Sequence, residues 1–185
     1  QNPALLLPGM TVHFEDVTHH PVSVSVPKQI IPTEKPSVEP VFKITAPSLQ
    51  MLIQDEGRFN QTNIGVGTAG AMDLAAMHSA NRIVGNPIQS AVIEVLNGGL
   101  KAKMQGSAVI AVTGARSNIC VKFADGQNAD FDSYQAIALD AGDEFQIQTP
   151  TAGLRNYLSI RGGFDLQPVL NSYSFDSLAV LGPEP

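Results

Sequence analysis

The run Ala91-Val92-Ile93-Glu94-Val95-Leu96, followed by the turn residues Asn97-Gly98-Gly99, is the clearest indicator of the fold class. An apolar run of this length between turn signals is typical of a short β-strand that packs in a core. Comparable runs recur along the chain at Phe42-Lys43-Ile44, Met51-Leu52-Ile53, Ala108-Val109-Ile110-Ala111-Val112, Ile119-Cys120-Val121-Lys122-Phe123, Ala136-Ile137-Ala138-Leu139, Phe145-Gln146-Ile147 and Tyr157-Leu158-Ser159-Ile160. Many short strands at regular spacing predict a mainly β fold, either a barrel or a sandwich.

One short helix is predicted between Asp73 and Gly85. Asp is a preferred N-cap residue, Gly commonly ends a helix, and Pro87 prevents the helix from restarting. The residues expected on the buried face of the helix recur every three or four positions: Leu74, Met77, Ala80, Asn81 and Val84. The prediction is therefore one amphipathic helix within a β-rich protein.

The segment from Gly65 to Gly70 reads GxGxxG, the pattern of a dinucleotide-binding loop. That function requires a buried strand immediately before the glycines and a helix after them. The preceding run, residues 59–64, is too polar for a central parallel strand. The glycines are therefore interpreted as turn residues that allow a close backbone approach.

The composition excludes several classes of function. A net charge of −6 and a pI near 5.0 give no basic surface stripe, so no nucleic-acid partner is predicted. No apolar run is long enough for a membrane span, and a cytoplasmic protein is expected. The single Cys120 is predicted to be a small core residue, and the four histidines lack metal-ligand spacing, so no metal site is predicted. Only 15% of residues are charged, which indicates that part of the surface is buried against another polypeptide.

The chain is predicted to have three zones. Residues 1–17 contain a turn and an alternating strand, and residues 18–40 contain five prolines among polar residues. Such a Pro-rich segment is expected to act as a linker with no regular element. Residues 41–185 form the globular part, and residues 1–17 are expected to complete a separate, preceding module.

A dozen ordered motifs in residues 41–185 resemble the allophanate hydrolase subunit 2 family, which includes the C-type subunit of 5-oxoprolinase and part of the carboxyltransferase region of urea carboxylase. The motifs are Gln54-Asp55-x-Gly57-Arg58, Gly65, Gly70-Ala71-Met72-Asp73, Ala80-Asn81, Gly85-Asn86-Pro87, Glu94, Gly98-Gly99, Thr113-Gly114-Ala115, Ala141-Gly142-Asp143 and Arg161-Gly162-Gly163. The resemblance implies a cyclophilin-like β-barrel and, for residues 41–185, the N-terminal half of a C-type, carboxyltransferase-type domain.

Residues 1–17 resemble the closing strand of a B-type module, with Met10 where that family has Asp. This order implies a piece of a fused B–C protein, whose activity is expected to require the rest of the assembly. Within residues 171–174 the sequence reads Asn-Ser-Tyr-Ser, where the family often has Gly-Ser-Arg-Ser. The arginine of that family motif is therefore absent here.

The resemblance implies an ATP-dependent 5-oxoprolinase that acts on a cyclic amide with an A-type partner subunit. In that reaction ATP, with Mg²⁺, phosphorylates the amide oxygen of 5-oxoproline, and water opens the ring to give L-glutamate. ATP is thus expected as a co-substrate, although the sequence has no Walker-type loop. The alternatives are a urea amidolyase, an allophanate hydrolase or a carboxyltransferase. A further alternative, from another class, is a binding module that inhibits a sensor kinase.

Three residues are predicted to be catalytic. Arg58 is the best candidate for a substrate or phosphate contact, because a guanidinium presents a two-pronged donor to anions, but a local pair with Asp55 explains it equally well. Asp55 is a candidate base or substrate anchor. Glu94 lies within an apolar strand, so it either faces solvent or is placed in a cleft, where a buried carboxylate would mark a site.

Four further residues are predicted to bind substrate. Gln54 and Gln61 can hydrogen-bond an amide, although surface polarity explains them as well. Asp73 has two candidate roles, of which the helix cap is favoured. Arg161, before Gly162-Gly163, either pairs with an acid or lines the cleft.

Overall fold

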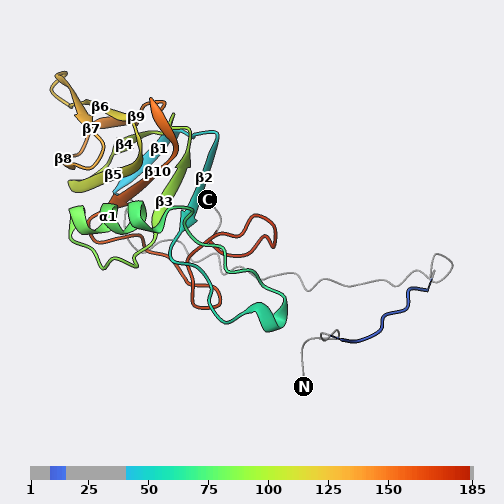
Figure 1. Ribbon diagram of the computed structural model, residues 1–185. Helices are drawn as coiled ribbons and strands as arrows, with labels where there is room; N and C mark the ends of the chain where they lie inside the picture. The colour runs from blue at the N-terminus through green and yellow to red at the C-terminus, as the bar shows by residue number, and fades with distance from the viewer. Residues whose placement is uncertain (1–8, 16–40, 184–185) are drawn as a thin grey trace. The chain divides into compact units, whose positions relative to one another are not determined.

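The structure is a computed structural model that describes residues 9–15 and 41–183 (Figure 1). The chain divides into two units, residues 1–39 and 40–185. In the first unit, residues 9–15 form neither a helix nor a strand, and the Phe14 side chain is 96% exposed. The described segment 9–15 is thus irregular backbone. Its assignment as the closing strand of a B-type module stays a prediction, and the predicted linker, residues 18–40, lies outside the described residues.

Residues 41–183 form two antiparallel five-stranded sheets. The first has the order β1 (Phe42–Ala46), β4 (Lys101–Met104), β9 (Glu144–Ile147), β6 (Asn118–Lys122), β7 (Asn128–Asp132). The second has the order β2 (Gln50–Gln54), β3 (Val92–Leu96), β10 (Ala152–Ile160), β5 (Ala108–Arg116), β8 (Ala136–Leu139). The mainly β prediction is confirmed, although the strand pairings of the described residues leave two sheets and do not close a barrel.

Both sheets contribute to one hydrophobic core. In β4 the alternation is strict, so that Ala102 and Met104 are buried while Lys101 and Lys103 face solvent. Other members of the core come from every strand of the second sheet and from β6 and β9, and they include Ile53, Val95, Val112, Ile119, Ile137, Phe145, Ile147 and Leu158. The core is thus built from the inward-facing residues of two layers, as in a sandwich.

The helix α1 (Leu74–Val84) covers the outer face of the second sheet (Figure 1). Asp73 caps it by accepting a 3.0 Å hydrogen bond from the Ala76 amide, and Gly85 ends it in a left-handed conformation, as predicted. A second apolar cluster joins the helix to the sheet through Met77, Val92 and Tyr157. Because the second sheet has the core on one face and α1 on the other, its central strands are buried on both faces.

Strand register places Glu94 on the helix-facing side of this sheet. Ile93 and Val95 belong to the core, so Glu94 points the opposite way. Its cross-strand neighbours are Leu52 on β2 and Tyr157 on β10. A carboxylate within an apolar strand is thereby directed toward the chain that enters α1.

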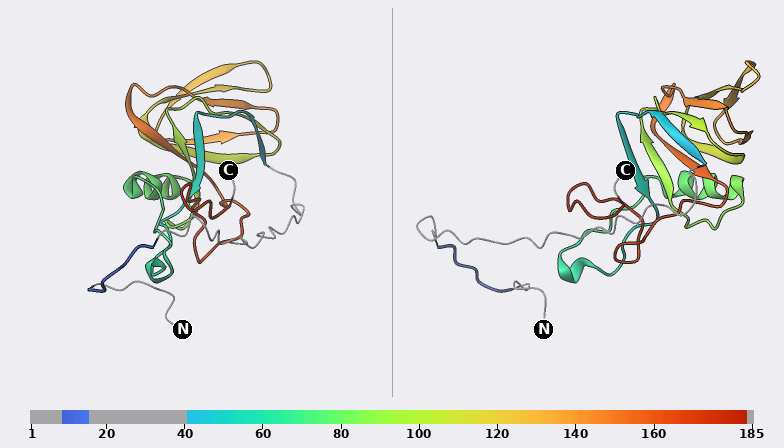
Figure 2. Two further views of the ribbon diagram at one scale, coloured as in Figure 1. Left: turned by 90° about the vertical axis from the view of Figure 1, so that its right-hand side faces the viewer. Right: turned by 180° about the vertical axis from the view of Figure 1, so that it is seen from behind.

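Two long loop regions leave the sheets on the same side of the unit (Figure 2). One is residues 55–73, which include a short 3₁₀ helix, η1 (Thr62–Ile64), and the other is residues 161–183. The GxGxxG glycines follow η1 and not a strand, which agrees with their interpretation as turn residues. No helix among the described residues is long and apolar enough to cross a membrane.

The prediction that Cys120 lies in the core is wrong. β6 alternates so that Ile119 and Val121 point into the core, and Cys120 between them is half-buried on the outer face. Its cross-strand neighbour is Asp130 on β7. A hydrogen bond to Asp130 and burial raise the pKa of the Cys120 thiol, so the thiol form is favoured.

Candidate functional site

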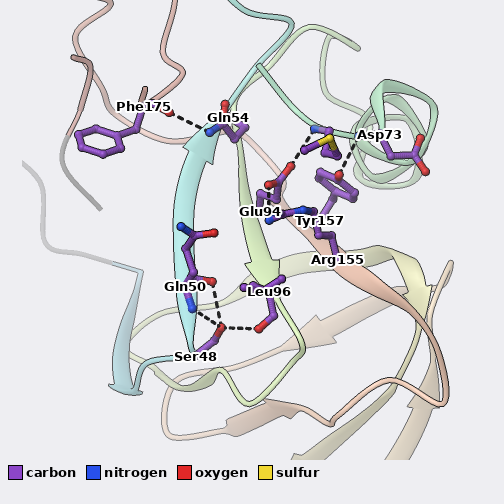
Figure 3. Close-up of polar contacts among 10 residues, drawn as sticks. Ser48, Gln50, Gln54, Asp73, Glu94, Leu96, Arg155, Tyr157 and Phe175 are labelled. Carbon is purple, nitrogen blue, oxygen red and sulfur yellow. Dashed lines mark hydrogen bonds and ion pairs between the residues drawn. The ribbon is translucent and has the colours of Figure 1, made fainter. Parts of the chain in front are cut away.

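Glu94 lies beside the N-terminus of α1 and is almost fully buried, with 5% of its surface exposed. Its Oε1 accepts a 2.9 Å hydrogen bond from Arg155 Nη1 and forms an ion pair with that guanidinium. Its Oε2 accepts a 2.9 Å hydrogen bond from the Met72 amide, on the loop that leads into α1 (Figure 3). Glu94 therefore joins three segments: β3, β10 and the entry to the helix.

Tyr157 completes this arrangement from β10. Its hydroxyl accepts a 2.8 Å hydrogen bond from the Asp73 amide (Figure 3). Burial and the neighbouring Glu94 carboxylate raise the pKa of Tyr157, so the phenol stays protonated. Beside it on β5, the Thr113 hydroxyl donates a 2.6 Å bond to the Ala76 carbonyl. The first turn of α1 is thus fixed to the sheet by hydroxyl groups on both strands.

A pocket of about 520 Å³ opens next to these groups. We call it the α1 pocket; it is lined by Met72, Asp73, Gly114, Ala115, Arg116, Ala152, Gly153, Leu154, Arg155 and Tyr157. Its volume is within the range of small-molecule sites. Three of its lining residues, Asp73, Arg116 and Arg155, carry a formal charge, and Glu94 lies directly behind Arg155 and Tyr157.

Two glycines let β5 and β10 meet closely along this pocket. Gly114 has φ +88°, and a Cβ there would collide with the Arg155 carbonyl oxygen and lie 3.0 Å from the Tyr157 ring. A Cβ on Gly153 would lie 2.9 Å from the Ala115 Cα. The Thr113-Gly114-Ala115 motif therefore keeps the strands close and leaves Arg155 and Tyr157 in place.

A second polar cluster, which we call the C-terminal latch, consists of Asp55 and Arg58 with the segment 169–182 that they hold. Asp55 is buried and accepts four hydrogen bonds, from the Gly57 and Tyr173 amides and the Ser172 and Ser174 hydroxyls, at 2.5–2.8 Å. Burial raises the pKa of the Asp55 carboxyl, but the bonds from Ser174, Ser172, Tyr173 and Gly57 together lower it below its ordinary value. Asp55 is therefore an ionised anchor for the 172–174 turn.

Arg58 is the other half of the latch and is only 1% exposed. Its guanidinium donates to the backbone carbonyls of Val169, Ser174 and Leu181. Burial lowers the pKa of the guanidinium, while the charges of Asp55 and Asp176 act in the opposite direction. The described residues show no ion pair between Arg58 and Asp55, so the side chain holds three points of the backbone instead of a local carboxylate.

The other predicted substrate ligands lie apart from the α1 pocket. Gln54 is buried at the end of β2 and donates a 3.0 Å bond to the Phe175 carbonyl, beside the latch (Figure 3). The backbone carbonyl of Gln61 accepts the Ile64 and Val66 amides around η1. Arg161 donates a 3.0 Å bond to the Val84 carbonyl at the C-terminal end of α1, where a cation also favours the helix dipole.

The structure therefore divides the predicted site residues. Asp73 and Glu94 meet at the α1 pocket, Gln54, Asp55 and Arg58 meet at the latch, and Gln61 and Arg161 belong to neither. Three pocket residues, Arg155, Tyr157 and Arg116, were not predicted from the sequence. Two signals point to them: alternation along β10 places Arg155 and Tyr157 on one face, and Arg116 follows the Gly114 motif on the paired strand.

Metal-binding potential is limited among the described residues. They contain no group of three or more His, Cys, Asp or Glu side chains arranged to hold a metal ion. His78 and Glu56 form a pair at 2.8 Å that joins α1 to the 55–73 loop. This pair fastens the helix to the loop that also carries the latch residues.

Residues 64–185 match the family model of the carboxyltransferase domain, subdomains A and B. The chain belongs to the carboxyltransferase-domain family. Urea amidolyase from Saccharomyces cerevisiae is 37% identical over 142 residues, which cover 76% of this chain and 8% of that protein. The C-type subunit of 5-oxoprolinase from Escherichia coli is 30% identical over 142 residues, which cover 77% of this chain and 44% of that protein. The resemblance to the allophanate hydrolase subunit 2 family is thereby confirmed.

A solved structure supports the same assignment. The urea carboxylase of Kluyveromyces lactis superposes with a TM-score of 0.67 and 34% identity, over 72% of this chain and 11% of that one. These three relatives are enzymes or enzyme subunits, so this carboxyltransferase-family chain is enzyme-associated. It spans less than half the length of the curated relatives that it matches.

Proposed function

We propose that this carboxyltransferase-family chain is part of an ATP-dependent 5-oxoprolinase and that the α1 pocket binds the cyclic amide. The observation that carries the proposal is the buried Glu94, which holds Arg155 at the wall of a pocket of suitable volume. Buried charges are costly unless they are paired, and such pairs are often found where a protein binds or transforms a polar ligand. The similarity to the C-type subunit of the E. coli 5-oxoprolinase supplies the substrate class.

The pocket has a hydrogen-bond acceptor for the N–H of an amide and a donor for its carbonyl oxygen. One Asp73 oxygen caps α1, and the other has no partner among the described residues, so it can accept the substrate N–H. Arg155 gives one of its five N–H groups to Glu94 and can donate another to the amide oxygen, where negative charge develops. Glu94 acts through Arg155 and is a positioning residue in this proposal.

The latch residues have a different place in the proposed function. Asp55 and Arg58 bond to hydroxyl and backbone groups of the 169–182 segment, so their contacts support a positioning role for that segment. Gln54 supports the same segment through Phe175. Direct contact of Asp55 or Arg58 with the substrate, as inferred from the sequence, stays a prediction.

ATP enters the proposal as a co-substrate of the complete assembly. It would phosphorylate the amide oxygen before water opens the ring. We assign its binding, with Mg²⁺, to the A-type partner subunit, because the described residues combine neither a phosphate loop nor a cluster of metal ligands. A B-type module encoded in the same chain is the other partner in this proposal.

A second candidate is the carboxylation of urea. It is favoured by one observation: the S. cerevisiae urea amidolyase is 37% identical to this chain, compared with 30% for the C-type subunit of the E. coli 5-oxoprolinase. Urea is also an amide, and the Asp73 and Arg155 groups could hold it in the same way.

Steady-state assays of the full-length protein with its partner subunits test the proposal, with 5-oxoproline and urea as competing substrates and ATP consumption as readout. We expect turnover of 5-oxoproline and a loss of about 10- to 100-fold in Glu94→Gln, because Arg155 loses its fixed orientation. Glu144→Gln is the matched control, since Glu144 pairs with Lys103 on the exposed surface. Consumption of urea alone would replace the proposal with the second candidate, and kinase binding without turnover would support a regulatory module.

A further inference from the structure

Arg116 is the arginine of the α1 pocket that forms no ion pair among the described residues. It ends β5 opposite Ala152, and its backbone is held by Thr151, whose amide and hydroxyl both donate to the Arg116 carbonyl. Arg116 lines the pocket, and no carboxylate of the described residues forms an ion pair with it. The position of the residue is thus fixed by β-structure while its charge stays available.

The other two charged residues of the pocket, Arg155 and Asp73, already have contacts within the chain that favour their charges. The Arg155 charge is offset by Glu94 at 2.9 Å. The Asp73 charge lies at the N-terminus of α1, where the helix dipole favours an anion and the Ala76 amide is bonded to it. The guanidinium of Arg116, at the end of β5 that borders the pocket, has no such contact among the described residues.

We propose that Arg116 binds the carboxylate of the substrate, so that the α1 pocket selects an anionic amide. This inference rests on the proposed function and adds a specificity residue to it. Arginine suits this role because its planar fork donates two parallel hydrogen bonds to a carboxylate. An amide that spans the pocket meets Asp73 and Arg155 with its amide group and Arg116 with its carboxylate.

The same group distinguishes the two candidate substrates. 5-Oxoproline carries a carboxylate next to its ring nitrogen, whereas urea is neutral and has none. A guanidinium that loses water when a ligand enters needs an anion in return, so a neutral amide is disfavoured in this pocket. Arg116 therefore favours 5-oxoproline over urea as the substrate.

The test compares 5-oxoproline with 2-pyrrolidinone, the same lactam without the carboxylate, on the full-length protein in complex with its partner subunits. The affinity for each lactam is measured by calorimetry, and the inhibition of turnover by 2-pyrrolidinone is measured alongside. Both measurements are made on wild type, Arg116→Gln and Arg116→Lys. Arg82→Gln is the control for the loss of one positive charge, because Arg82 is exposed in the last turn of α1 and does not line the pocket. We expect Arg116→Gln to weaken 5-oxoproline binding about 10- to 100-fold and to leave the binding of 2-pyrrolidinone unchanged. Arg116→Lys should recover part of the loss, because it keeps the charge without the fork.

Three results would overturn this inference. They are wild-type affinity for 5-oxoproline in Arg116→Gln, an equal loss for both lactams, and the same loss in the Arg82→Gln control. The failure of the proposed function has a separate signature, since wild type would then turn over urea and not 5-oxoproline. If 5-oxoproline is hydrolysed and Arg116→Gln keeps the wild-type KM, the proposed function stands and the role of Arg116 is rejected.

Discussion

The C-terminal latch and the α1 pocket are both polar clusters beside the second sheet, but their side chains are used differently. In the latch, Asp55 directs both oxygens to amides and hydroxyls of its own chain, and Arg58 directs its donors to three carbonyls. In the α1 pocket, one Asp73 carboxylate oxygen and the Arg116 guanidinium have no hydrogen-bond partner among the described residues.

The contrast separates the residues that shape a site from those that meet a ligand. A carboxylate with four internal donors is already solvated by the protein and gains little from a substrate. Two buried polar atoms without a partner, Arg58 Nη1 in the latch and Gln54 Oε1 beside it, belong to side chains already anchored to the backbone. The latch is therefore expected to control stability and the pocket to control affinity.

The largest loss of stability is expected from Asp55→Ala. It removes the acceptor for two hydroxyl and two amide donors and leaves them in a buried region, so we expect a loss of about 3–4 kcal/mol in the free energy of unfolding. Urea denaturation measures it, with Asp165→Ala, an exposed aspartate of the same loop region, as the control. A loss below about 1 kcal/mol, or an equal loss in the control, would contradict the structural role of the latch.

A smaller but more specific effect is expected from Gly114→Ala. The added Cβ must adopt φ +88° and would collide with the Arg155 carbonyl, which we expect to cost about 2–3 kcal/mol. Because the strand must shift beside Arg155 and Tyr157, substrate affinity should fall as well. Thermal unfolding and KM are measured together, with Gly106→Ala as the control, since a Cβ there meets nothing within 4 Å. An unchanged KM in a folded Gly114→Ala variant would show that the Thr113-Gly114-Ala115 motif does not determine substrate affinity.

The pH dependence of stability tests whether the charge of the Asp55 carboxylate stabilises the latch. The folded-state pKa of Asp55 is lowered from 3.8, so between the two pKa values the unfolded state binds more protons and stability rises with pH. The contribution of Asp55 is therefore fully present well above pH 3.8 and is lost as pH falls through the folded pKa. We expect the stability difference between wild type and Asp55→Asn to be constant from about pH 7 to about pH 5 and to shrink below about pH 4. A difference that persists at the acid end would assign the effect to hydrogen-bond geometry and not to charge.

Most of the fold could be predicted from the sequence, because eight strands are apolar runs bounded by turns. β4 and β7 escape sequence-based prediction for a physical reason: each has only one large apolar residue, Met104 in β4 and Phe131 in β7, among alanine and polar or charged residues. In such strands the pairing with neighbours, and not the local pattern, decides the structure.

The site was harder to predict, because burial depends on tertiary contacts. Asp55 and Arg58 have the charge and spacing of a catalytic pair, and the local sequence holds no sign that the distant residues 169–182 take up their hydrogen bonds. Arg116 and Arg155 look like ordinary strand residues until β5 and β10 are paired. Their common pocket exists only in the folded sheet.

The smallest stability effect, and the finest test of the two roles of Asp73, comes from comparing Asp73→Asn with Asp73→Ala. Asn keeps a side-chain oxygen for the Ala76 amide, so Asp73→Asn should change stability by only about a few tenths of a kcal/mol, whereas Asp73→Ala loses the cap and about 1 kcal/mol. The amide NH₂ of Asn, however, would face the substrate N–H in place of an acceptor oxygen, and two donors repel each other. If the pocket binds the amide as proposed, Asp73→Asn raises KM about tenfold while its unfolding curve overlies that of wild type. If KM is unchanged in Asp73→Asn, Asp73 only caps α1, and substrate recognition in the pocket is left to its arginines.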